Sequence, residues 1–143
     1  MRGGRLKMTS VQRHRLMVIR VLGLGGAVGL FMFFAWRTSP WLSELPWLPH
    51  WLSAWADEYG VARNVAAFFA FGLVGFTLLG RGWRPAVLQG VFATGQEVVQ
   101  IWRPRRLFDW RDILASLFGL FLGWLGVTAV ACLLRAWRRR RGS

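Results

Sequence analysis

The chain has 143 residues, of which 55% are hydrophobic, and its 19 basic and six acidic residues give a formal net charge of +13. This length allows one compact unit and excludes a separate catalytic domain beside a membrane bundle. A composition that is both so apolar and so basic is not typical of a soluble globular protein, and we therefore expect an integral membrane protein.

The basic residues indicate membrane topology and contact with anionic lipid headgroups rather than nucleic-acid binding. Eighteen of them are arginine, and they gather at the edges of hydrophobic runs instead of forming one phosphate-binding stripe. The single cysteine, Cys132, excludes an internal disulfide and a thiolate metal cluster. No sequence pattern for a metal or a cofactor is present, so none is expected.

Four segments approach the length of about 20 apolar residues that a membrane-spanning helix needs. They are residues 17–36, 61–80, 85–102 and 113–134. The third is the least hydrophobic, and a strict hydropathy window would miss it. The fold class that we predict is an all-α bundle of four transmembrane helices over residues 17–134, with basic tails at 1–16 and 135–143.

Both chain ends are predicted to be cytoplasmic, because arginines precede the first span and follow the last. The short loop with Arg81 and Arg84 is then also inside, and residues 37–60 are outside. No A-x-A cleavage pattern follows Trp36, so the first span is expected to be an uncleaved anchor. Alternatively, residues 85–102 stay in the inner interface, which moves the arginines at 103–106 inside and the C-terminus outside.

The outer loop is rich in tryptophan. It holds half of the ten tryptophans, counting Trp36 at its start, and tryptophan favours the headgroup level of a bilayer. Prolines preclude one long helix, but "HWLSAWADEY" places Trp51, Leu52, Trp55 and Tyr59 on one side. A short helix in the outer interface is the main prediction, and a platform for stacking glycans is the alternative.

A polar face follows the third span into "GQEVVQIWRPRRLFDWRD", residues 95–112. At 100° per residue, about one third of the helix surface carries Gln89, Gln96, Glu97, Gln100 and Arg103. Such a face needs protein partners or water, because unpaired polar groups in hydrocarbon cost several kcal/mol. This segment also carries Arg103, Arg105 and Arg106. The four-span topology places these arginines on the outer face of the membrane, although basic residues usually favour the cytoplasmic side.

The fourth span carries a face of small residues. It comprises Asp112, Ala115, Ser116, Gly119, Gly123 and Gly126. Small faces let helix backbones approach closely in lipid, so this face is expected to pack tightly on another span. If that neighbour is the third span, Asp112 lies near Glu97. The glycines of "GLGGAVG" in the first span are likewise expected to pack against helices.

Two interpretations of the polar cluster stay open. Glu97 and the arginines could close the loop over the bundle, with Asp109 and Asp112 paired to Arg106 and Arg111. Alternatively, the guanidinium groups bind an anionic lipid headgroup or a lipid-linked precursor, while Glu97 and Asp112 orient them or act as acid and base. No familiar catalytic motif is present.

The same residues resemble the VanZ-like family of small bacterial membrane proteins, which is named for a teicoplanin-resistance protein. The matching residues are Glu97, Gln100, Pro104, Arg106, Asp109, Asp112, Gly119 and Gly123, and Asn64, Phe68 and Gly72 match a second element. The resemblance covers about 45–126. The sequence departs from the family pattern at Arg105, where a small residue is usual, and at Ser116, where Asn is common.

The resemblance implies a multi-pass inner-membrane protein of the bacterial cell envelope, in some cases linked to glycopeptide resistance. We expect Gln100, Arg103, Arg105, Arg106, Asp109 and Asn64 to bind an anionic envelope lipid or a lipid-linked glycan. The alternatives are an enzyme that modifies such a lipid with Glu97 and Asp112, and an accessory subunit that contacts another envelope membrane protein.

Overall fold

The computed structural model is helical throughout the residues that it describes, 9–36, 41–102 and 109–141. The elements are α1 (Ser10–Trp36), the 3₁₀ helix η1 (Leu42–Glu44), α2 (His50–Glu58), α3 (Gly60–Leu79), α4 (Trp83–Gln100) and α5 (Trp110–Arg141). Since these ranges contain no strand, the predicted all-α class is confirmed.

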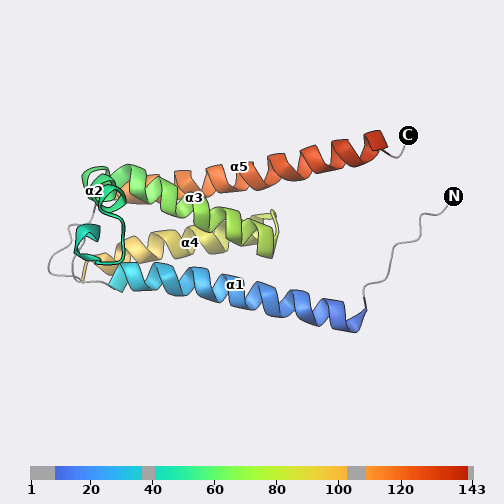
Figure 1. Ribbon diagram of the computed structural model, residues 1–143, viewed down its shortest axis with the longest axis horizontal. Coiled ribbons are helices and arrows are strands. Elements are labelled where there is room, and N and C mark those ends of the chain that lie inside the picture. Colours follow the sequence, from blue (N-terminus) through green and yellow to red (C-terminus); the bar gives the residue numbers. More distant parts are fainter. Residues whose placement is uncertain (1–8, 37–40, 103–108, 142–143) are drawn as a thin grey trace.

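The four longer helices lie side by side and alternate in direction (Figure 1). One end of the bundle, called the α2 end, carries η1 and α2. The opposite end, called the terminal end, holds the first residues of α1, the last residues of α5 and the turn between α3 and α4 (Figure 1). Among the described residues, α1, α3 and α5 are long and apolar enough to cross a membrane, whereas α4 has the length but is less apolar.

The first and last helices are longer than predicted. The segments 10–16 and 135–141, expected as tails, continue α1 and α5. At the start of α1, the backbone N–H of Gln12 donates to Thr9 Oγ1 over 3.2 Å and the Thr9 N–H donates to Gln12 Oε1 over 3.1 Å, a reciprocal cap. At the end of α5, arginines both favour helix and interact well with the helix dipole.

The small face of α5 packs on α3, and this is the most extensive helix contact in the described chain. A Cβ added to Gly123 would lie 2.9 Å from Gly72 Cα, and one added to Gly119 would lie 2.9 Å from Phe69 N. Only glycine permits this approach, so the predicted tight packing is present. Its partner is α3, which corresponds to the second predicted span, 61–80. It is not α4, which corresponds to the third predicted span, 85–102.

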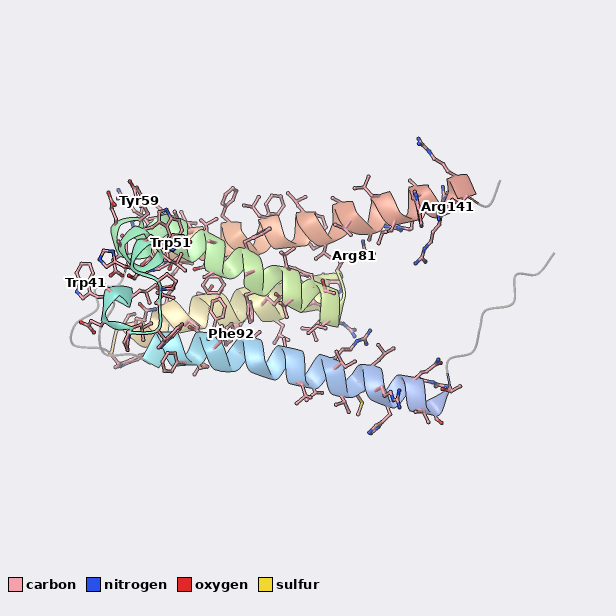
Figure 2. All side chains as sticks on the ribbon, in the orientation of Figure 1. Trp41, Trp51, Tyr59, Arg81, Phe92 and Arg141 are labelled. Atoms are coloured by element: carbon pink, nitrogen blue, oxygen red, sulfur yellow. The ribbon has the colours of Figure 1, made fainter. Side chains whose placement is uncertain are left out.

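Phenylalanines join α1 and α4 to this pair. The ring of Phe31 in α1 lies 4.9 Å from that of Phe68 and 4.8 Å from that of Phe71, while Phe92 of α4 stacks on Phe71 at 5.1 Å. Figure 2 shows Phe92 on the side of α4 near α1. These rings are the main attachment of α1.

The glycines of α1 meet the packing expectation only in part. A Cβ on Gly23 would lie 3.0 Å from Leu78 Cδ1 of α3, but Gly25, Gly26 and Gly29 face no neighbouring atom of the described chain within 4 Å. The expectation is therefore correct for Gly23 and wrong for the other three, because only one narrow face of α1 contacts the other helices.

Gly123→Val should destabilise the bundle, because its side chain would push α3 and α5 apart. We expect a loss of about 1–3 kcal/mol, the usual cost of overpacking, measured as a lower unfolding temperature in detergent micelles. Gly25→Val is the matched control, since it makes the same change in a helix where nothing lies within 4 Å. Equal losses in the two variants would contradict the packing.

Candidate functional site

The polar face of α4 is turned into the bundle. Gln89 is 2% exposed, Glu97 is 5% exposed and Gln96 is also buried, whereas Gln100 is half-buried. A carboxylate and two amides at such positions need polar surroundings, because burial without hydrogen bonds is costly. The low hydropathy of α4 thus comes from side chains that the other helices cover.

Glu97 lies one helical turn from an apolar layer. That layer is a buried cluster of Phe68 from α3, Ala93 from α4 and Leu120 from α5. Residues four apart share a helix face, so one turn toward the α2 end brings Asn64, Glu97 and Ser116 to a common level. We call these three residues the polar layer. Glu97 and Ser116 are buried, and Asn64 is half-buried.

Ser116 is the most enclosed member of the polar layer. Its side chain is 0% exposed, and its Oγ has no hydrogen-bond partner within the described residues. A hydroxyl group is one donor and two acceptor sites, and leaving it unsatisfied in the interior costs about 1–3 kcal/mol.

One turn closer to the α2 end lie Gln100 of α4 and Asp112 of α5, both half-buried. Asp109 stands just before α5, where its Oδ1 accepts the backbone N–H of Arg111 over 2.9 Å. Asp109 O accepts the backbone N–H of Asp112 over 3.0 Å. Asp109 therefore caps the helix, a role that Asp performs well.

The arginines expected to hold an anion, Arg103, Arg105 and Arg106, fall outside the described residues, as does Pro104. Their role stays a prediction, as do the ion pairs expected between Arg106 or Arg111 and the two aspartates. Of the predicted site, the described residues bring Asn64, Glu97 and Ser116 to one level and Gln100 and Asp112 to the next.

The sequence predicted no partners for the two buried side-chain amides of α4, Gln89 and Gln96. Gln89 Nε2 donates to Pro85 O over 3.3 Å, and its Oε1, without a partner in the described chain, occupies the space beside Gly75 that a Cβ would fill. Gln96 Nε2 donates to Met32 Sδ of α1 over 3.6 Å. The spacing of Gln89, Gln96 and Glu97 indicated an inward face but could not identify the helix opposite each residue.

Asp57 connects the short elements at the α2 end. Its Oδ1 accepts the Leu42 N–H over 2.6 Å, its Oδ2 accepts the Ser43 N–H over 3.0 Å, and Arg63 Nη1 of α3 lies 3.9 Å from Oδ1. Burial raises the pKa of Asp57, but these hydrogen bonds and the charge of Arg63 lower it by more, so the pKa lies below its usual value of 3.8. The sequence offered no signal for this arrangement.

The tryptophan-rich segment exposes its rings. In α2, Trp51 and Trp55 are exposed together with Tyr59, which follows the helix, whereas Ser53 and Ala56 are buried. Figure 2 shows Trp41, Trp51 and Tyr59 around the α2 end of the bundle. The exposed aromatic side agrees with the amphipathic pattern of the sequence, although Leu52 is half-buried.

The sequence model of one protein family, described as VanZ/LLP1, matches residues 27–134. The chain belongs to the VanZ/LLP1 family. No curated protein and no solved structure matches it significantly.

The VanZ/LLP1 match includes every contact that organises the candidate site. It begins shortly before Phe31, contains Asp57 and the whole polar layer, and ends at Leu134, just before the arginine-rich end of α5. The first half of α1 and the arginines at the end of α5 lie outside the match. The VanZ/LLP1 assignment thus confirms the resemblance that the sequence suggested.

Asp57→Asn should loosen the α2 end, because Asn cannot supply two acceptor oxygens or a charge for Arg63. We expect the amide hydrogens of Leu42 and Ser43 to exchange about tenfold faster, corresponding to one hydrogen bond to a charged group. Glu58→Gln is the control, because Glu58 is the exposed neighbour on the same helix. No acceleration in the Asp57 variant, or an equal one in the control, would contradict this role.

The effect of pH follows from the lowered pKa of Asp57. A depressed pKa contributes stability that is present above the unfolded value of 3.8 and is lost as pH falls through the folded value. Between pH 6 and pH 3, the unfolding temperature of the wild type should therefore fall further than that of Asp57→Asn. Parallel curves for the two proteins would show that Asp57 does not carry this dependence.

Proposed function

We propose that the chain is a multi-pass protein of the bacterial inner membrane, in which α1, α3, α4 and α5 all span and both termini are cytoplasmic. α4 is about 27 Å long at 1.5 Å per residue and runs beside α3. Its polar side chains are mostly covered by the bundle, so a lipid-facing surface of valine and glycine is compatible with a fourth span.

The distribution of charge supports this orientation. Ten described arginines belong to the terminal end: Arg13, Arg15, Arg20, Arg81, Arg84, Arg135 and Arg138 to Arg141. All six acidic residues belong to the α2 end: Glu44, Asp57, Glu58, Glu97, Asp109 and Asp112. Basic residues favour the cytoplasmic side, which assigns the terminal end to the inside and the polar layer to the outer leaflet.

The function that this arrangement supports best is binding of an anionic envelope lipid or a lipid-linked precursor. The observation that carries the proposal is a buried carboxylate, Glu97, level with the hydroxyl of Ser116, which has no hydrogen-bond partner within the described residues. Arg103, Arg105 and Arg106 follow the same helix end in sequence and supply the positive charge. Through such a lipid, the protein affects susceptibility to glycopeptides.

A lipid-modifying enzyme is the second candidate. It is favoured by two carboxylates at successive levels of the same bundle end, Glu97 buried and Asp112 half-buried. Two carboxyl groups in different environments can divide the roles of acid and base. Glu97→Gln separates the candidates, because an enzyme would lose turnover of the lipid while it still binds the lipid.

The orientation is tested first. A cysteine introduced by Arg105→Cys in a Cys132→Ala background should react with a membrane-impermeant thiol reagent on intact cells. The control is Arg84→Cys in the same background, on the turn at the terminal end, which should react only after lysis. Labelling of position 105 only after lysis would place these arginines inside and overturn the outer-leaflet site.

Arg106→Lys should weaken binding of a polyprenyl phosphate, because lysine keeps the charge but loses the paired N–H donors of the guanidinium group. We expect about a tenfold lower affinity, read from the ligand-induced rise in unfolding temperature. Arg111→Lys, on an exposed residue of α5, is the matched control. Equal affinities in wild type and Arg106→Lys would contradict anion binding at this residue.

A further inference from the structure

The turn between α3 and α4 stops short of the ends of the outer helices. Gly23 of α1 packs on Leu78, in the last turn of α3, and Trp124 Nε1 of α5 donates to Arg81 O of the turn over 3.2 Å. From these points, α1 and α5 both continue beyond the turn and diverge (Figure 1). They make no contact with each other in the described chain.

The projecting parts of both helices begin as apolar surface. On α1, the exposed residues from Gly23 back to Leu16 are apolar except for Arg20, and on α5 the apolar run continues from Trp124 to Leu134. At 1.5 Å per residue, these stretches are about 10 Å and about 15 Å long. If hydrocarbon covers them, the turn that carries Arg81 and Arg84 lies well below the level of the lipid headgroups.

Arginines at that depth need an anionic partner, because a charged group inside a bilayer is costly. No acidic side chain of the chain can provide one, since all six belong to the α2 end. The Arg84 guanidinium lies 5.5 Å from the ring of Trp83, which is itself 71% exposed, so this pair faces the surroundings of the bundle. Figure 2 shows Arg81 at the turn, between the projecting helices.

We propose that Arg81 and Arg84 bind the phosphate group of an anionic phospholipid from the leaflet at the terminal end and draw it below the surrounding headgroups. Guanidinium groups match phosphate oxygens with paired N–H donors. The acyl chains of this lipid lie against the exposed apolar residues of α1 and α5. This site is at the opposite end of the bundle from the polar layer and does not depend on the ligand proposed there.

The test uses the full chain in nanodiscs that contain phosphatidylcholine and phosphatidylglycerol, with native mass spectrometry of the lipids retained on release. The wild type should retain phosphatidylglycerol in preference, and Arg81→Gln with Arg84→Gln should lower that preference at least fivefold in 0.3 M salt, where exposed charges are screened. The control, Arg138→Gln with Arg139→Gln, removes the same charge beyond the apolar run of α5 and should keep the preference.

Retention of phosphatidylglycerol by the turn variant at the wild-type level would overturn the proposal, as would an equal loss in the control. Arg81→Lys with Arg84→Lys keeps the charge and guards against a folding defect in the glutamine variant. It should fold, measured by the unfolding temperature, and retain an intermediate preference for the anionic lipid. A lysine variant that folds and keeps the full wild-type preference for phosphatidylglycerol would contradict a paired guanidinium contact.

Discussion

The close approach of α3 and α5 is the constraint on which the rest of the bundle depends. Gly119 and Gly123 bring the backbone of α5 onto that of α3 near Gly72, with no side chain between them. Because this contact sets the register of the two helices, it places Phe68 against Leu120 and brings Asn64 level with Ser116. α4 contributes Ala93 to the apolar layer and Glu97 to the polar layer.

Charge is divided between the two ends of the molecule. The acidic residues at the α2 end are used in local structure, as Asp57 and Asp109 show by accepting backbone N–H groups. The acidic residues belong to the α2 end, whereas ten of the described arginines belong to the terminal end. This division of charge is the pattern that the positive-inside rule associates with a cytoplasmic terminal end, as proposed above.

Hydrophobic length and residue type were enough to predict the helices, the exposed aromatic side of the loop and the small face of α5. They did not identify the partner of that face, because periodicity shows which residues share a side and not what lies opposite. The limits 17 and 134 were also too narrow, since a reciprocal cap at Thr9 and helix-favouring arginines extend α1 and α5. The Asp57 arrangement depends on loop geometry, which no spacing in the sequence encodes.

The weak attachment of α1 has a consequence for how the chain can change during evolution. Before Gly23, the described residues of α1 are all exposed, and the family match begins only at residue 27. Substitutions there encounter lipid or solvent rather than a fitted neighbour. Selection can therefore act on the length, apolarity and charge of this segment while leaving the order of its residues free, so relatives can differ most in this exposed part of α1.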